Sequence, residues 1–251
     1  QVTIYRDSWG VPHIYADTDA AAAYGLGYAQ AEDRLGDIYG NARIATGTAS
    51  EAFGPEHIRN DFGLQLVRNA DVAQKSYAEA PDYLRELSDS FVAGMNAYIE
   101  KNPSKKPEWA MDFQPWHCSA IGRAMIMRWP LGTVADDLRN RRERPGAGAS
   151  NQWAVAPSRS ATGGAILLTD PHLSWEGMAN FYEARVHGDK LHMNGFFLVG
   201  SPLMGFGHSN HIGWAPTTGG PDTSDVFEVK IDMSNLMKPK FEMDGQWHDI
   251  T

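Results

Sequence analysis

The chain has 251 residues, and its 42% apolar content can fill a conventional core in one large domain or two small ones. A formal net charge of −9 argues against a nucleic-acid binder, because phosphate recognition needs a clustered excess of lysine and arginine. No stretch approaches the roughly 18 to 20 apolar residues of a membrane-spanning helix, so no membrane span is expected.

The beginning of the chain gives a prediction about its location. Residues 1–6 lack the charged and then apolar pattern of a signal peptide, and no methionine precedes them. We therefore expect that a signal peptide is absent or already removed and that the protein is periplasmic or secreted. The single cysteine, Cys118, cannot form an internal disulfide and leaves the redox compartment open.

The first predicted helix covers residues 20–45, where small and apolar residues recur at helical spacing. Thr18 or Asp19 is placed to cap its first turn, and Gly47 is placed to end its last.

Two further helices are predicted before residue 130. The first covers residues 81–100, with a proline in its first turn and one apolar face. The second covers 119–129, and Pro130 is expected to end or kink it. The first half of the chain is thus predicted to be mainly helical.

The character of the chain changes near residue 149. Four arginines within 139–144 precede the small residues of 145–149, a composition that suits an exposed and cleavable connector. Strands are predicted beyond it, at 151–156, 165–169, 181–187, 192–199, 211–216 and 226–231. The sequence therefore predicts a helical part, 1–149, with its connector at about 139–149, and a β-rich part, 150–251.

Common catalytic and metal-binding motifs are absent from the sequence. It contains no Gly-x-Ser-x-Gly elbow, no Walker loop, no His-Glu-x-x-His helix and no cysteine-based zinc spacing. His208 and His211 are close in sequence, but without a third ligand they make only a weak case for a metal.

Specific strings follow one another along the chain. They are Arg-Asp-Ser-Trp-Gly-Val-Pro-His-Ile at 6–14, Gly-Tyr-Ala-Gln-Ala-Glu-Asp-Arg-Leu at 27–35, Phe-Val-Ala-Gly-Met-Asn-Ala-Tyr-Ile at 91–99, Ser-Asn-Gln-Trp at 150–153, Asp-Pro-His-Leu-Ser-Trp at 170–175, Gly-His-Ser-Asn at 207–210 and Ile-Gly-Trp-Ala-Pro-Thr-Thr-Gly at 212–219. In this order they resemble the penicillin acylase family of N-terminal nucleophile hydrolases, over most of the chain. The string at 150–153 resembles the start of the family's large subunit.

The resemblance implies an α+β fold, the four-layer αββα sandwich of this hydrolase class. Residues 1–149 would be the small-subunit region, with helices packed around a sheet that begins at Ser150, the start of the large subunit. It also implies that the chain cuts itself between Ala149 and Ser150, and that Ser150 is then the catalytic nucleophile. The remainder of the large subunit is the implied protein partner, in a heterodimer formed by self-cleavage.

An N-terminal serine carries its own base. A serine hydroxyl is a poor nucleophile at neutral pH and needs a proton acceptor nearby. The α-amino group freed at Ser150 would have an ordinary pKa of about 7.7 to 8.0, so near pH 7.5 a substantial fraction is neutral and can accept the proton. The uncut precursor should lack activity, because the nitrogen of Ser150 is then a non-basic amide.

The resemblance implies two further catalytic residues. The backbone N–H of Thr218 would donate to the oxyanion of the tetrahedral intermediate. The His172 imidazole could bond the Ser150 amine or hydroxyl and bias its protonation. The alternatives are a core or supporting histidine at His172 and a plain strand-start serine at Ser150.

A calcium site and an acyl pocket are also suggested. The resemblance implies a structural Ca²⁺ at Asp222, Ser224 and Asp225, although such acids in a polar loop are usually only solvated. No cofactor is implied for catalysis. Aromatic residues that could line an acyl pocket, or simply form core, are Trp153, Trp175, Phe181, Phe196, Phe197 and Phe206.

The sequence departs from the family pattern in two places. Ala149 stands before the nucleophile where family members usually have glycine, and its Cβ could slow the cut. The family's large subunit has several hundred residues, and the asparagine that serves as its side-chain oxyanion donor lies beyond the equivalent of Thr251. We therefore expect an incomplete chain.

The sequence predicts an acylase that hydrolyses amides through an acyl-enzyme on Ser150. Candidate substrates are N-acyl homoserine lactones, β-lactams with acyl side chains and acylated peptides. The string at 170–175 is nearer to cephalosporin and acyl-homoserine-lactone acylases than to the penicillin G type. The alternatives are an uncut or degenerate member that binds acylated ligands without turnover, and a plain structural fragment.

Overall fold

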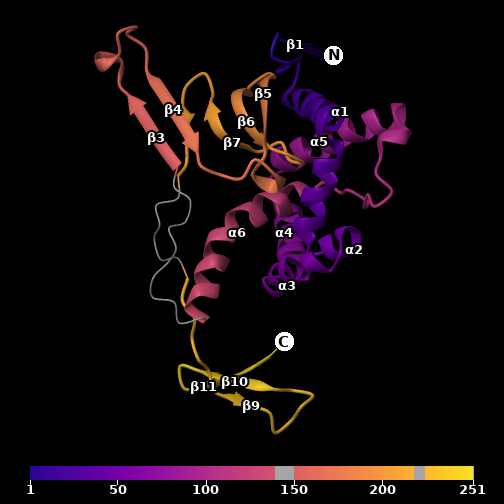
Figure 1. Ribbon diagram of the computed structural model, residues 1–251, viewed down its shortest axis with the longest axis vertical. Coiled ribbons are helices and arrows are strands. Elements are labelled where there is room, and N and C mark those ends of the chain that lie inside the picture. The colour runs from indigo at the N-terminus through magenta and orange to yellow at the C-terminus, as the bar shows by residue number, and fades with distance from the viewer. Residues whose placement is uncertain (139–149, 218–223, 251) are drawn as a thin grey trace. The chain divides into compact units, whose positions relative to one another are not determined.

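The computed structural model describes residues 1–138, 150–217 and 224–250 (Figure 1). The chain divides into two compact units, one of residues 1–128 with 146–220 and one of residues 129–145 with 221–251. Helices dominate the described residues before 139 and strands those after 149, so the predicted α+β class and helical first half are confirmed. No helix of the described residues has the length and apolar character needed to cross a membrane.

The elements follow one another along the chain. The helices are α1 (Asp19–Thr46), α2 (Ala49–Phe53), α3 (Ile58–Leu66), α4 (Asn69–Ala78), α5 (Asp82–Lys101) and α6 (Trp116–Leu138). The strands are β1 (Val2–Arg6), β2 (Pro12–Ala16), β3 (Ser150–Val155), β4 (Ile166–Pro171), β5 (Phe181–His187), β6 (His192–Leu198), β7 (Met204–His208), β8 (Gly213–Trp214), β9 (Ile231–Asp232), β10 (Lys240–Met243) and β11 (Gln246–Asp249). Within the described residues they form sheets of order β1-β2-β5-β6-β7-β8, β3-β4 and β11-β10-β9.

Helix α1 begins and ends as its sequence predicts. The Thr18 hydroxyl accepts a hydrogen bond from the Ala21 N–H at 3.1 Å, which satisfies one of the free donors of the first turn. Gly47 ends the helix at φ 66°, a left-handed conformation that costs glycine nothing and other residues strain. Its buried face is made largely of alanines and glycines, so other backbones can approach it closely.

The closest approach is the crossing of α1 and α5. A Cβ atom added to Gly27 would lie 1.9 Å from the carbonyl oxygen of Phe91, and one added to Gly94 would lie 1.9 Å from the carbonyl oxygen of Tyr24. The two helices therefore touch backbone to backbone, and each supplies one glycine to the contact.

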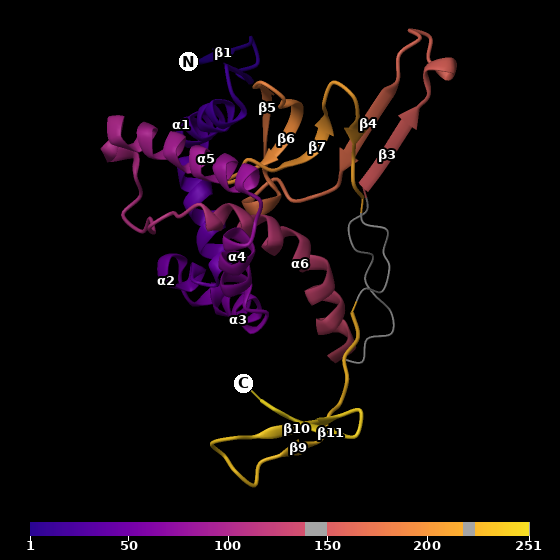
Figure 2. The ribbon, with the colours of Figure 1, turned by 180° about the vertical axis from the view of Figure 1, so that it is seen from behind.

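The large sheet combines strands from both ends of the first unit (Figure 2). Strand β2 pairs in parallel with β5, and Ile14 lies opposite Val186. Tyr182, Ala184 and Val186 of β5 are buried while Glu183 and Arg185 are exposed, which is the alternation of a strand with one covered face. The prediction that the sheet begins at Ser150 is wrong for the large sheet, because β1 and β2 belong to it. Among the described residues β3, which begins at Ser150, pairs only with β4.

Three other secondary-structure predictions need correction. The strand predicted at 211–216 is limited to Gly213–Trp214. Of the two outcomes predicted at Pro130, an end of the helix is wrong, because α6 continues to Leu138 although a proline supplies no N–H to the helix. Residues 226–230 form no strand, and the apolar side chains of Val226, Phe227 and Val229 are exposed. The short helices α2, α3 and α4 were not predicted at all.

Buried amide side chains join α1 to the turn after β6. Gln30 accepts a hydrogen bond from the Gly200 N–H at 2.9 Å and donates to the carbonyls of Leu198 and Ser201. Asn41 donates to the Val199 carbonyl at 3.0 Å. Helix side chains therefore satisfy these backbone groups of the turn.

His117 gives the first unit a pH-dependent stability. Its ring is 2% exposed, accepts a hydrogen bond from the Gln114 N–H at 2.8 Å and stacks on Trp116. Burial lowers its pKa to about 4. As the pH is lowered from 6.5 to 4, the unfolded chain therefore binds a proton that the folded chain does not. The free energy of unfolding decreases over this window by up to about 3 kcal/mol.

Replacing His117 by phenylalanine is expected to flatten that dependence. Urea-unfolding midpoints measured at intervals from pH 7 to 4 should fall steeply for the natural protein and less steeply for His117→Phe. His211→Gln, at an exposed histidine, is the matched control and should keep the natural slope. An unchanged slope in His117→Phe would contradict the assignment.

Candidate active site

Ser150 is the first residue of β3 and is held by two neighbouring segments. Its Oγ accepts a hydrogen bond from the main-chain N–H of His172 at 3.3 Å, just beyond the end of β4. Its carbonyl oxygen accepts a hydrogen bond from the Thr217 hydroxyl at 2.9 Å. In the β3–β4 ladder it lies opposite Pro171. Both the reactive oxygen and the backbone of the predicted nucleophile are thus fixed by residues distant in sequence.

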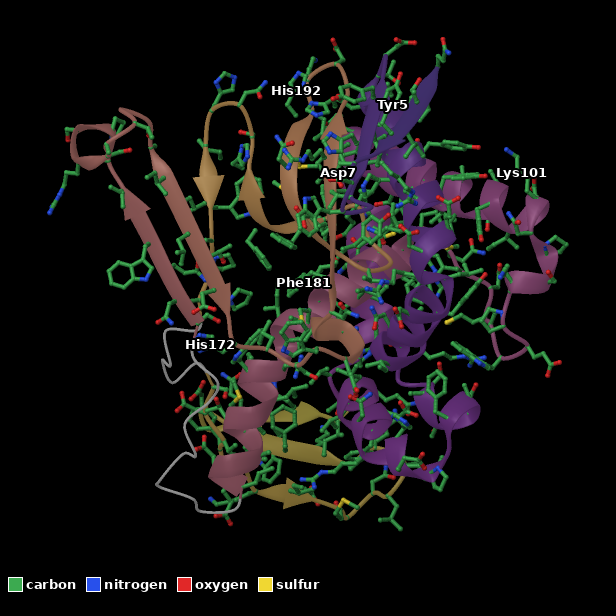
Figure 3. All side chains as sticks on the ribbon, turned by 45° about the horizontal axis from the view of Figure 1, so that its top comes forward. Tyr5, Asp7, Lys101, His172, Phe181 and His192 are labelled. Atoms are coloured by element: carbon green, nitrogen blue, oxygen red, sulfur yellow. The ribbon has the colours of Figure 1, made fainter. Side chains whose placement is uncertain are left out.

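The His172 ring is turned to a different partner. Its Nε2 lies 2.9 Å from Asp170 Oδ2 and 3.3 Å from Asn151 Nδ2, and Asn151 also donates to the Asp170 carboxylate at 3.1 Å. The hydrogen bond from His172, and next that from Asn151, hold the pKa of Asp170 below its usual range. Figure 3 places His172 at the end of the β3–β4 hairpin. The contact predicted between its ring and Ser150 is not formed here, since the main chain of His172 makes it instead.

Four residues of the site were not singled out by sequence reasoning. They are Asn151, Gln152, Asp170 and Thr217. Two of them, Asn151 and Asp170, lie opposite each other in the hairpin register. Their signal was present, because each belongs to a string that had been noted, but only the strand pairing shows that they meet.

Several predicted site residues fall outside the described part of the chain. These are the cleavage residue Ala149, the oxyanion donor Thr218 and the calcium ligand Asp222. Of the other two calcium candidates, Ser224 donates its hydroxyl to the Pro130 carbonyl at 3.1 Å and Asp225 is exposed. Among the described residues no group of three His, Cys, Asp or Glu could hold a metal ion.

The aromatic candidates for an acyl pocket divide into three groups. Phe181, Phe196 and Phe206 contact one another, with ring centroids 4.8 Å apart for Phe181 and Phe206 and 4.9 Å apart for Phe196 and Phe206. Figure 3 shows Phe181 at the start of β5. Phe197 is fully buried in the core, whereas Trp153 and Trp175 are 66% and 93% exposed. Only the first group is an aromatic cluster.

Known proteins resemble the chain over nearly all of its length. It is 25% identical to an acyl-homoserine lactone acylase, PvdQ, of Pseudomonas fluorescens, over 97% of this chain and 36% of that protein. It is 26% identical to the penicillin acylase 2 proenzyme of Pseudomonas sp. strain SE83, over 90% of this chain and 37% of that protein. The chain therefore spans little more than a third of the length of these relatives.

A solved structure and a family model complete the comparison. The structure of thermostable penicillin G acylase from Alcaligenes faecalis matches with a TM-score of 0.47 and 22% identity, over 57% of this chain and 84% of that chain. The family model of penicillin amidase matches residues 1–251. Because this match covers the whole sequence, the chain belongs to the penicillin amidase family.

Proposed function

We propose that Ser150 is the N-terminal nucleophile of a self-processing acylase that hydrolyses the amide bond of an N-acylated substrate. Membership of the family supports amide hydrolysis as the reaction class. The observation that carries the residue assignment is the hydrogen bond from the His172 N–H to Ser150 Oγ, which holds the hydroxyl at the start of a strand.

The proposed reaction is acyl transfer. Ser150 Oγ attacks the acyl carbonyl carbon and its proton passes to the freed α-amine of the same residue. The carbon–nitrogen bond then breaks and the leaving amine takes that proton, which leaves an ester on Ser150. Water attacks the ester carbonyl and gives a proton to the α-amine, the bond to Ser150 Oγ breaks as Oγ takes that proton, and the carboxylic acid leaves. The Thr218 N–H is the proposed oxyanion donor, a contact whose removal costs about 3 to 4 kcal/mol in comparable sites. His172 is proposed to bias the protonation of the amine.

The substrate class we favour is N-acyl homoserine lactones or cephalosporin-type β-lactams. One matched relative is named an acyl-homoserine lactone acylase and another a penicillin acylase, which supports acyl homoserine lactones and β-lactams as classes. Acylated peptides are the other candidate class. The complete gene product should be incubated with acyl amides that differ in chain length and in leaving amine, and the released amine measured. Hydrolysis of none of them would contradict the proposal.

The active protein in this proposal is cut once and contains more of the large subunit than the given chain. The bond between Ala149 and Ser150 is cut, the remainder of the large subunit completes a four-layer αββα sandwich, and the protein is periplasmic or secreted. A structural calcium at Asp222, Ser224 and Asp225 is also proposed, and no cofactor for catalysis. Intact mass with N-terminal sequencing tests the cut directly, because a chain that begins at Ser150 should be found.

The second candidate is an uncut member that binds acylated ligands without turnover. Ala149 favours it, because a Cβ restricts the backbone next to the bond that must be attacked. Binding of an acyl amide by a chain that stays uncut and inactive would support this candidate against the enzyme.

A further inference from the structure

The hairpin that carries Ser150 needs support from outside itself. Strands β3 and β4 form a sheet of their own within the described residues, and a single two-stranded hairpin is marginally stable in water. Two side-chain hydrogen bonds join it to the stretch after β8. Gln152 Nε2 donates to the Pro216 carbonyl at 2.8 Å, and the Thr217 hydroxyl donates to the Ser150 carbonyl at 2.9 Å.

These two bonds are adjacent and run in opposite directions. Gln152 holds the residue next to Thr217, and Thr217 holds the residue two before Gln152. Side chains alternate along a strand, so Gln152 shares a face of β3 with Ser150. The stretch at Pro216 and Thr217 is therefore joined to β3 by two bonds, one from the Gln152 side chain to the Pro216 carbonyl and one from the Thr217 hydroxyl to the Ser150 carbonyl. We call this pair of bonds the clamp.

The surroundings of Gln152 leave its amide little freedom. Its cross-strand neighbour is Thr169, and both Gln152 Oε1 and Thr169 Oγ1 are buried without a hydrogen-bond partner among the described residues. An unpaired buried oxygen costs stability. Of the two ends of the Gln152 amide, only Nε2 has a hydrogen-bond partner among the described residues, and that partner is the Pro216 carbonyl.

We propose that Gln152 is a positioning residue for Ser150. By holding the Pro216 carbonyl it fixes Thr217, and the Thr217 hydroxyl fixes the carbonyl of Ser150. The inference rests on the proposed function, in which Ser150 is the nucleophile. Small displacements of a nucleophile reduce the rate of the chemical step, with losses on the order of 10²-fold for a 1 Å shift.

The test uses two variants of matched size in the complete gene product. Gln152→Met keeps the length of the side chain and removes the donor, while Thr169→Val removes only the unpaired hydroxyl of the opposite residue. Gln152→Met should lower kcat about tenfold, a smaller loss than a full 1 Å shift would cause, and change KM less than about twofold. Thr169→Val should keep both constants. Equal constants in Gln152→Met and the natural enzyme would overturn the proposal.

A third variant separates positioning from misfolding. In Gln152→Glu the carboxylate cannot donate to Pro216, but a protonated Glu can. The kcat of this variant relative to that of the natural enzyme should rise as the pH falls towards about 4.3, the ordinary pKa of glutamate. A ratio that does not change with pH would contradict the proposed hydrogen bond.

Hydrogen exchange tests the clamp without a measurement of enzymatic activity. The backbone N–H groups of residues 213–215 and of Thr217 should exchange faster in Gln152→Met and at the natural rate in Thr169→Val. If the natural protein hydrolyses nothing but exchange is still faster in Gln152→Met, the proposed function fails while the clamp stands. Unchanged exchange in Gln152→Met would overturn the clamp, whatever the protein hydrolyses.

Discussion

Replacing Gly27 by alanine is expected to destabilise the protein by about 3 kcal/mol or more, enough to leave little soluble folded material. The new Cβ would lie 1.9 Å from the Phe91 carbonyl oxygen. Both groups belong to helix backbones, so no side chain can move aside to make room. Helices α1 and α5 would have to separate along a contact that is buried on both sides. Urea unfolding and the yield of soluble protein measure the effect.

Gly36 of the same helix supplies the matched control. A Cβ added there meets no atom within 4 Å, and the residue is exposed. Gly36→Ala is expected to stabilise the helix by about 0.5 to 1 kcal/mol, since alanine loses less backbone entropy than glycine. The interpretation would be refuted by a Gly27→Ala protein with the unfolding midpoint of the natural chain.

Replacing Ser150 by alanine is expected to abolish both self-cleavage and turnover. In the proposed mechanism the same Oγ attacks the bond before Ser150 and, later, the substrate. The rate of amide hydrolysis should fall by a factor on the order of 10³ or more. The fold should survive, because the half-buried hydroxyl accepts one long hydrogen bond of 3.3 Å from the His172 N–H. Intact mass and amine release are the measurements.

Ser174→Ala is the control for this experiment. Ser174 lies in the string that contains His172, and its hydroxyl only accepts a hydrogen bond from the Glu176 N–H in the same turn. This variant should be cut and active like the natural protein. Cleavage or turnover that persists in Ser150→Ala would rule out the nucleophile assignment.

Local patterns in the sequence predicted the elements whose signals are local. The limits of α1 follow from Thr18 and Gly47. Strand β5 matches its predicted residues, 181–187, and these residues alternate between a buried and an exposed face. Residues 226–231 show apolar residues typical of a strand, yet only Ile231 enters one. A strand needs a neighbour to bond with, and composition does not reveal whether one is present.

The short helices α2, α3 and α4 were not predicted, and tertiary contacts rather than a buried apolar face hold this region. In α3 the apolar residues Ile58, Phe62 and Leu66 recur four residues apart, a helical spacing that the sequence does contain, but the residues are 57%, 66% and 68% exposed, so burial of this face does not hold the helix. The buried polar residue Asp61 holds this region in place, since its carboxylate accepts hydrogen bonds from the N–H groups of Ala49 and Ser50. Such a tertiary contact fixes where α2 begins without leaving an apolar pattern.

The candidate site was predictable in its residues but not in its contacts. The strings around Ser150 and His172 marked both residues. Whether the imidazole or the main chain of His172 reaches Ser150 depends on the register of β3 with β4, which places Asp170 and Asn151 together and draws the ring to them. The role of Gln152 depends on its distance from Pro216, 64 residues away in sequence.

The large sheet contains strands from both sides of the proposed cut before Ser150. Strands β1 and β2 precede the cut, and β5 to β8 follow it, yet β2 and β5 share a ladder and the carboxylate of Asp33 binds both Arg6 and Tyr182. Severing one peptide bond leaves all of these interactions in place. Neither piece could diffuse away without exposing the interior that it shares with the other. The two polypeptides would thus stay associated after the cut. We expect each to be obtained in folded form only when both are produced together.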